Sequence, residues 1–101
     1  MYLVYILLCS DGTFYTGTAK DVFERFKKHK EGKGAKYTRT HSPEKLVAVW
    51  NTEDKSTALK TEMRIKKLTK NKKEELIRSP EKIESYIGLN AEKSAEFYNK
   101  E

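Results

Sequence analysis

A glutamate stands where the pattern of a helix predicts a buried apolar side chain. On a helical wheel for residues 58–68, Glu62 falls about 40° from Ala58, within the arc of apolar side chains. A carboxylate among apolar neighbours is costly unless it is paired or binds a metal. Glu62 is therefore a candidate metal ligand. The alternatives are a helix of different phase and an ion pair with Arg25.

Four other side chains are candidate functional groups because of their types and spacing. Arg25 and His29 are four residues apart, so they share one face if residues 22–30 form a helix. Taken alone, such a pair is typical of an ordinary basic helix surface. Tyr5 and Tyr15, ten residues apart, are by themselves more typical of core aromatics than of catalytic groups.

The chain has 101 residues, which predicts one domain. Cys9, as the single cysteine, excludes an internal disulfide, and one cysteine with two distant histidines excludes the usual cysteine–histidine zinc site. His41 and Ser42 have no visible partners, so no serine–histidine system is predicted. No apolar run approaches the ~20 residues of a membrane span, and no basic leader precedes the first one. We expect a cytoplasmic location.

The charge is concentrated in two blocks. The chain is 36% charged and 37% hydrophobic, with a net charge of +6. Residues 20–45 hold nine basic and four acidic side chains, and residues 60–73 hold seven basic and one acidic. If the blocks converge in the fold, they form a patch suited to phosphates. The alternative is two solvated helix faces without a partner.

The elements that must position these residues follow from local patterns. Three strands, four helices and a loop are predicted, with a weakly helical tail over residues 91–101. The strands are residues 2–9, 14–17 and 46–51; the helices are 22–30, 56 or 57 to 68, 71–77 and 80–87; the loop is 32–43. The predicted fold is α+β in β-β-α-β-α-α order, with a small three-stranded antiparallel sheet flanked by helices. Residues 1–88 are expected to form the domain and 89–101 a helical or frayed tail.

The turn between the first two strands allows two registers. A two-residue loop, Asp11-Gly12, places Tyr5 and Tyr15 on opposite faces of the hairpin. A three-residue loop starting at Ser10 pairs Tyr5 with Gly17 and places both tyrosines on one face, with Gly12 in the left-handed region. The residues alone favour neither register.

The ordered set of motifs resembles the GIY-YIG nuclease superfamily. The set comprises Val4-Tyr5-Ile6, Tyr15-Thr16-Gly17, the helix that carries Arg25 and His29, and Glu62. It covers roughly residues 2–78. The runs at residues 32–39 and 65–68 are similar to those of the small stand-alone bacterial members, which resemble the nuclease subunit of eukaryotic structure-specific endonucleases. Val4 and Thr16 replace the Gly and Ile of the name motif.

The resemblance implies an endonuclease that hydrolyses DNA phosphodiester bonds with one divalent ion, Mg²⁺ or Mn²⁺. By match, Glu62 would bind the metal and Arg25 the scissile phosphate. Tyr5 and Tyr15 would orient or deprotonate the attacking water, with cations lowering their pKa values. His29 would be a supporting phosphate contact or a group behind the site. Both tyrosines must then reach one phosphate, which favours the three-residue loop.

Further residues are predicted to contact nucleic acid. Gly17 would let the nucleic-acid backbone approach the sheet. The complete predicted set of nucleic-acid contacts is Gly17, Lys20, Lys28, Lys36, Arg39, Lys66 and Lys67. Branched, flapped or single-stranded DNA is the expected partner of a monomer with a role in DNA repair or processing, together with an unidentified protein partner. The competing hypothesis is a nucleic-acid-binding module on the same fold that does not cleave.

Overall fold

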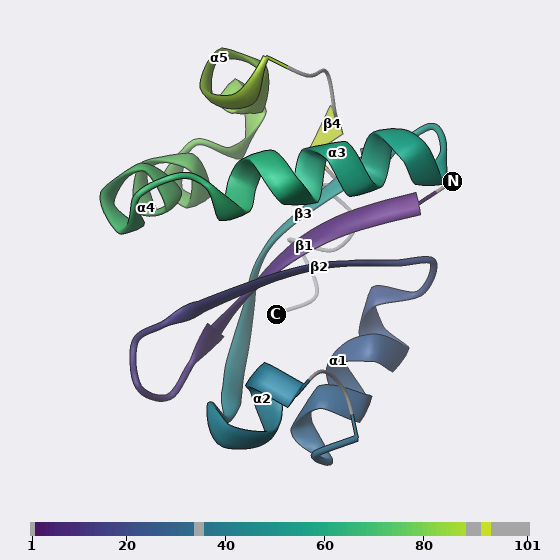
Figure 1. Ribbon diagram of the computed structural model, residues 1–101, viewed down its shortest axis with the longest axis vertical. Coiled ribbons are helices and arrows are strands. Elements are labelled where there is room, and N and C mark those ends of the chain that lie inside the picture. Colours follow the sequence, from purple (N-terminus) through teal and green to yellow (C-terminus); the bar gives the residue numbers. More distant parts are fainter. Residues whose placement is uncertain (1, 34–35, 89–91, 94–101) are drawn as a thin grey trace.

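The strand β1 (Tyr2–Cys9) lies at the centre of the three long strands of the sheet (Figure 1). It pairs antiparallel with β2 (Phe14–Ala19) on one side and with β3 (Pro43–Thr52) on the other. The computed structural model describes residues 2–33, 36–88 and 92–93, without the side chain of Arg39. The continuous apolar run of β1 is covered on both faces, as expected of a central strand.

The first two strands form the hairpin with the three-residue loop. Tyr5 pairs with Gly17 and Leu7 pairs with Tyr15. Gly12 has a φ of 83°, in the left-handed region that glycine adopts without strain. The register that places both tyrosines on one face is therefore confirmed.

The helices begin at residues whose side chains cap them. Asp21 accepts a hydrogen bond from Glu24 N, and Asp54 accepts one from Thr57 N. The predicted cap at residue 56 or 57 is thus wrong, because the Asp54 carboxylate starts the helix earlier. The helical segments are α1 (Val22–Lys30), α2 (Lys36–Thr40), α3 (Lys55–Lys66), α4 (Lys70–Arg78), the 3₁₀ turn η1 (Pro80–Lys82) and α5 (Ile83–Ile87).

The short helix α2 occupies part of the segment for which a loop was predicted. Its five residues are polar and lack the apolar periodicity that marks a helix in sequence. Thr38 in this helix is nonetheless 2% exposed, so tertiary contacts hold the turn in place. The predicted element order is otherwise confirmed.

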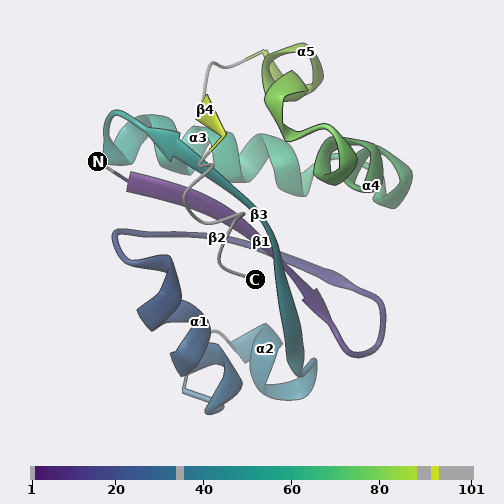
Figure 2. The same ribbon diagram turned by 180° about the vertical axis from the view of Figure 1, so that it is seen from behind.

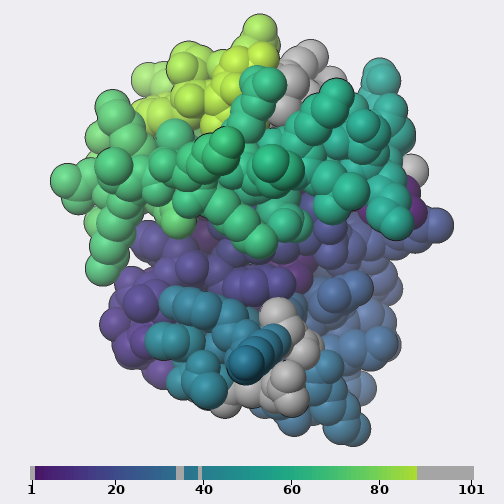
Figure 3. Space-filling view, in the orientation of Figure 1, coloured from purple at the N-terminus to yellow at the C-terminus, as the bar shows by residue number. Residues whose placement is uncertain are grey.

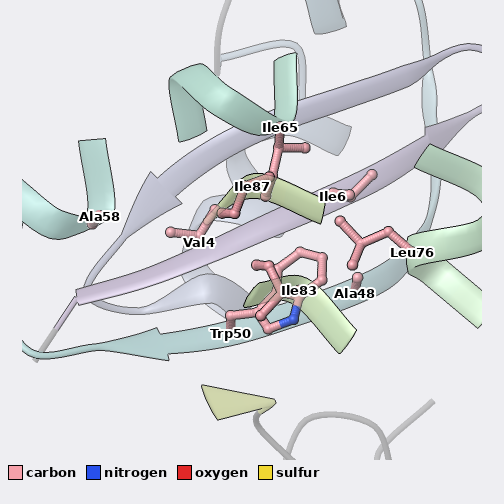
Figure 4. Close-up of a cluster of buried hydrophobic side chains, with 9 residues drawn as sticks. All are labelled: Val4, Ile6, Ala48, Trp50, Ala58, Ile65, Leu76, Ile83 and Ile87. Atoms are coloured by element: carbon pink, nitrogen blue, oxygen red, sulfur yellow. The ribbon is translucent and has the colours of Figure 1, made fainter. Parts of the chain in front are cut away.

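Helices cover the two faces of the sheet differently (Figures 1 and 2). One face packs on α1 through Leu3, Tyr5 and Leu7 of β1. The opposite face packs on α3, α4 and α5, and it holds the larger apolar cluster around Trp50 (Figure 4). The indole Nε1 of Trp50 donates to Pro80 O at 2.8 Å, which satisfies the polar atom of this buried ring.

A fourth short strand extends the sheet. β4 (Glu92–Lys93) pairs antiparallel with Trp50 and Asn51 of β3. At these two residues the expected helical or frayed tail is wrong, because the open edge of β3 offers backbone partners. Residues 89–91 and 94–101 lie outside the described part of the chain. Within that part, no helix has the length and apolar character needed to cross a membrane.

Candidate active site

Tyr5 and Tyr15 meet on one face of the hairpin, beside Gly17. Their ring centroids are 6.3 Å apart. A Cβ at Gly17 would lie 2.6 Å from Tyr5 Oη and 3.0 Å from Tyr15 Cε2. The space beside Gly17 is thus filled by the tyrosine rings. This contradicts the expectation that Gly17 leaves room for a nucleic-acid backbone, because its missing side chain makes room for Tyr5.

His29 is a buried partner of Tyr5. Its side chain comes from α1, where Val22 and His29 are the buried residues. Tyr5 Oη lies 2.9 Å from His29 Nε2, and Thr38 Oγ1 lies 2.6 Å from His29 Nδ1. At 1% exposure His29 does not reach the surface, so the expected direct phosphate contact is wrong. The buried position of His29 agrees with the other expectation, a group behind the site.

Burial favours the neutral forms of Tyr5, Tyr15 and His29. Desolvation raises the pKa of Tyr5, the neighbouring Tyr15 and Glu62 raise it further, and Arg25 opposes them. The pKa of Tyr15 is also raised, chiefly by burial. The pKa of His29 is lowered by burial and by Arg25. Contrary to expectation, Arg25 does not bring the net pKa of either tyrosine below its ordinary value, because desolvation outweighs it.

Arg25 is exposed on α1, yet it acts electrostatically on the buried groups. Its charge lowers the pKa of Tyr5, Tyr15 and His29 alike, so all three side chains lie within the range of its field. No ion pair joins it to Glu62 within the described residues. Arg25 is thus available for an anion next to the tyrosines.

Glu62 lies at the border of the buried stripe of α3. The buried residues of this helix are Ala58, Thr61 and Ile65. The side chain of Glu62 is 18% exposed and pairs with Lys66 Nζ at 2.9 Å. The expected place of Glu62 at the centre of the buried stripe is wrong. In α3 Thr61 faces the core, and the apolar side chains beyond Glu62 on the helix surface are exposed. Thr61 tolerates burial since its hydroxyl donates to Thr57 O at 2.8 Å.

The exposure of two apolar side chains of α3 confirms that the buried face of this helix differs from the predicted one. Leu59 and Met63 are 43% and 57% exposed, although the wheel placed them with the core. The pairing of Glu62 with Arg25, one alternative from the sequence, does not occur within the described part of the chain, where Lys66 is the ion-pair partner of Glu62.

The two flanking helices bring both basic blocks to the tyrosines. Figure 3 shows the hairpin strands as a purple band between α3 above and the blue α1 and α2 regions below. Lys66 of α3 acts electrostatically on Tyr15. A depression of about 430 Å³ is lined by four basic side chains, Lys20, Arg25, Lys28 and Lys55, and by two acidic ones, Asp21 and Glu24.

The remaining predicted nucleic-acid contacts have different places. Lys36 is exposed on α2, and Lys67 is exposed at the end of α3. Lys66 is half-exposed but engaged by Glu62. Arg39 lies in α2, and its side chain is outside the described part of the chain.

Sequence reasoning missed the groups that support the site from α2. Thr38 holds His29, and Tyr37 stacks on Tyr15 at 6.0 Å between centroids. His41, expected to have no partner, bonds Asp11 through Nδ1 and stacks on Tyr37 at 4.1 Å. The four-residue spacing of Tyr37 and His41 is the one signal that could have indicated their contact.

Glu62 fits a hydrated divalent ion rather than a metal held by protein groups alone. Among the described residues, no cluster of three or more His, Cys, Asp or Glu could hold a metal. Mg²⁺ usually keeps several waters and binds one or two carboxylates together with substrate phosphates. A single carboxylate beside an exposed guanidinium agrees with that donor set, provided that Lys66 releases it.

The chain combines a small antiparallel sheet with a candidate site at its edge strand β2. Residues 1–75 match the GIY-YIG catalytic domain, and the chain belongs to the GIY-YIG family. This confirms the resemblance seen in the motifs, and the domain indicates a nuclease-type hydrolase.

Several relatives are small proteins of the same kind. The UPF0213 protein BH0048 of Halalkalibacterium halodurans is 50% identical over 76 residues, covering 75% of this chain and 81% of the relative. The UPF0213 protein SA0446 of Staphylococcus aureus is 52% identical over 77 residues, covering 76% and 94%. The solution NMR structure of UPF0213 protein BH0048 from Bacillus halodurans covers 89% of this chain and 100% of its own, with a TM-score of 0.50 and 42% identity.

Proposed function

We propose that this chain is a divalent-metal-dependent endonuclease that hydrolyses DNA phosphodiester bonds. The observation that carries the proposal is the meeting of Tyr5, Tyr15 and His29 on one face of the hairpin. The charges of Arg25 from α1 and Glu62 from α3 both act on the two tyrosines. A cation for the phosphate and a carboxylate for a metal thus flank two phenols, which is the donor set that phosphodiester hydrolysis needs.

Each side chain has a role that follows from its place. Arg25 binds the oxygens of the scissile phosphate through its planar donors. Tyr15 orients the attacking water. In the tautomer in which His29 Nδ1 donates to Thr38 Oγ1, Nε2 accepts a hydrogen bond from the Tyr5 hydroxyl. At 1% exposure, Tyr5 supports Tyr15 from behind, with the two ring centroids 6.3 Å apart.

The neutral state of His29 supports this arrangement. Its lowered pKa keeps Nε2 unprotonated at neutral pH, so the ring can accept the hydrogen bond from the Tyr5 hydroxyl that holds Tyr5 in place. Glu62 would hold the metal, Mg²⁺ or Mn²⁺. When bound, the ion supplies Lewis-acid stabilisation of the leaving oxygen.

The proposal extends to the biological setting. We infer a cytoplasmic protein that acts as a monomer on branched, flapped or single-stranded DNA in repair or processing, with a separate protein partner. Two basic segments on either side of β2 support a DNA substrate, because phosphate neutralisation dominates nucleic-acid affinity.

One observation favours a second function, a nucleic-acid-binding module without cleavage. Lys66 occupies Oε2 of Glu62 at 2.9 Å, and this pairing competes with a metal for the carboxylate. In that case Glu62 would serve only to fix Lys66 on the DNA-facing surface.

Cleavage of flapped and branched DNA separates the two functions. The wild-type chain should nick these substrates with Mg²⁺ or Mn²⁺ and not with EDTA. Glu62→Gln should lower cleavage by roughly 100-fold or more, the size typical of losing a transition-state electrostatic contact. DNA binding in EDTA should hold or rise, since a negative charge is removed.

The matched control is Glu84→Gln, which removes an exposed carboxylate from α5, a helix on the opposite face from α1. It should cut at the wild-type rate. The unfolding free energy of Glu62→Gln should change by less than about 1 kcal/mol, because the Lys66 partner is largely exposed. A Glu62→Gln chain that still cuts at the wild-type rate would overturn the assignment, and tight binding without metal-dependent nicking would favour the binding module.

A further inference from the structure

We propose that His41 presents a stacking surface for an unpaired nucleobase beside the candidate active site, an inference that rests on the proposed action on DNA. No motif behind the nuclease assignment includes this residue. It stands at the outer end of a series of aromatic rings that begins at the catalytic tyrosines.

The series consists of two ring stacks. Tyr15 and Tyr37 have centroids 6.0 Å apart and planes inclined by 25°. Tyr37 and His41 are closer, at 4.1 Å and 13°. The series therefore leads from the site at β2 across α2 to the surface.

The open part of the last ring is a face and an edge. One face of the His41 imidazole lies on Tyr37, and its Nδ1 edge bonds Asp11. The side chain is nevertheless 34% exposed. What remains open is therefore the other face and the Nε2 edge, which is the surface that a stacked base would use.

Asp11 holds this ring in a fixed orientation. Its Oδ2 accepts a short hydrogen bond from His41 Nδ1, while its Oδ1 accepts from Thr13 N at 3.1 Å and from Thr13 Oγ1 at 2.6 Å. These bonds lower the pKa of the Asp11 carboxyl, so the acceptor stays ionised at neutral pH. A ring that is already immobilised loses little conformational freedom when a base stacks on it.

The clamp between Asp11 and residue 41 does not by itself need an aromatic ring, because it requires only a donor. The turn at Ser10 is also joined to the end of the α2 segment by a backbone hydrogen bond from Ser10 N to Ser42 O, at 2.8 Å. The stack on Tyr37 accounts for one face of the His41 ring. The opposite face is the part of the ring that neither contact uses.

The surroundings favour a nucleotide over another flat ligand. Lys36 is exposed at the start of the same helix, and the segment 20–45 that contains it carries nine basic and four acidic side chains. Stacking of a base on an aromatic side chain, with cations along the backbone, is how single-stranded nucleic acid is bound without sequence preference. The substrate class is accordingly DNA with at least one unpaired nucleotide next to the scissile phosphate.

Two substitutions separate the stacking surface from a clamp. His41→Asn keeps a donor for Asp11 and removes the ring. His41→Phe keeps the ring and removes the donor. The probe is a flapped duplex with 2-aminopurine at single unpaired positions, titrated in EDTA so that nothing is cut, with a blunt duplex as the control ligand.

Stacking predicts quenched fluorescence at one or more unpaired positions in the wild type. His41→Asn should lose that quenching and bind the flap roughly 5- to 100-fold more weakly, the range for one lost base stack, with blunt-duplex affinity unchanged. His41→Phe should keep both quenching and flap affinity. The reverse pattern, a loss in His41→Phe and none in His41→Asn, overturns the proposal in favour of a clamp.

The wild-type fluorescence keeps the test decisive even if a variant misfolds. Absence of quenching at every unpaired position overturns the stacking surface, while metal-dependent cleavage in the same preparation leaves the endonuclease standing. Quenching without cleavage has the opposite meaning. A chain that binds neither DNA contradicts both proposals.

Discussion

Tyr5 and His29 form a buried pair whose two pKa values move in opposite directions for one physical reason. Burial penalises the charged form of each group, so the phenol holds its proton more tightly and the imidazole takes one up less readily. Their 2.9 Å contact is thus a hydrogen bond between neutral groups. Tyr5 and His29 are therefore both uncharged at neutral pH.

The lowered pKa of His29 predicts a loss of stability on mild acidification. An unfolded imidazole titrates near about pH 6.5, whereas the folded one titrates lower. Below about pH 6.5 the unfolded chain therefore binds more protons, and the free energy of unfolding falls as the pH falls toward the folded pKa. Urea unfolding at about pH 7.5 and pH 5.5 measures this change.

The control for this prediction is His29→Asn, which keeps a polar group near Thr38 and cannot titrate. Its stability should depend less on pH over the same interval, whatever its absolute value. Asp11 and Asp54 also have lowered carboxyl pKa values, but they titrate below the interval. An equal pH dependence in both proteins would show that His29 does not stay neutral on folding.

At the scale of elements, the two faces of β2 are under different packing constraints. Gly17 faces the tyrosines, where a Cβ would meet Tyr5 Oη. Thr16 faces the opposite way at 3% exposure, and within the described residues its Oγ1 is buried without a hydrogen-bond partner. Gly17 is thus tightly constrained by the Tyr5 ring, whereas Thr16 carries an unsatisfied buried hydroxyl that a substitution can remove.

Gly17→Ala should destabilise the chain and impair the site together. The added methyl must displace the Tyr5 ring from His29, and overpacking of this kind costs about 1–3 kcal/mol. Cleavage should fall by more than the loss of folded protein explains. Thermal unfolding and single-turnover cleavage of a flapped substrate, done on the same preparation, check both effects.

Thr16→Val is the matched control on the opposite face of β2. It exchanges a hydroxyl for a methyl of similar size and removes an unsatisfied buried group, so stability should hold or rise by up to about 1 kcal/mol. Cleavage should be unchanged. If Gly17→Ala behaves like Thr16→Val, the close approach of Tyr5 to the strand is not a constraint.

At the scale of the whole molecule, two helices from different parts of the chain form one basic surface. The depression beside Arg25 takes Lys20 and Lys28 from the α1 side and Lys55 from the start of α3. Lys66 approaches Tyr15 from the other end of α3. A nucleic-acid backbone crossing β2 would pass between these groups.

This surface predicts a steep dependence of DNA affinity on salt. Each neutralised phosphate contributes a slope of about −0.9 in a plot of log affinity against log salt for duplex DNA. Lys28→Gln should reduce the slope by about one contact, whereas Lys82→Gln, in η1 on the opposite face, should leave it unchanged. Binding titrations from low to physiological salt decide the matter. A wild-type affinity that hardly varies with salt would mean that DNA does not bind here.

Much of the hairpin and the first helix could be predicted from local residues. The loop glycine Gly12 and the alternating strand pattern allowed the correct register, although the choice between two registers came from the expected shared site of Tyr5 and Tyr15. The apolar pattern of residues 22–30 predicted the helix that carries Arg25 and His29. These features depend on neighbours a few residues away, which the sequence displays directly.

Other features were decided only by the tertiary structure. The phase of α3, and with it the place of Glu62 at the border of the buried stripe, depends on how the helix packs on the sheet. The burial of His29 needs Thr38, and the order of His41 needs Asp11, thirty residues away. Helix α2 has no apolar period of its own and is held by these contacts. Local propensity determines the three long strands and the longer helices of this protein. Desolvation and long-range hydrogen bonds determine α2 and which side chains meet, because both depend on what the folded chain places beside them.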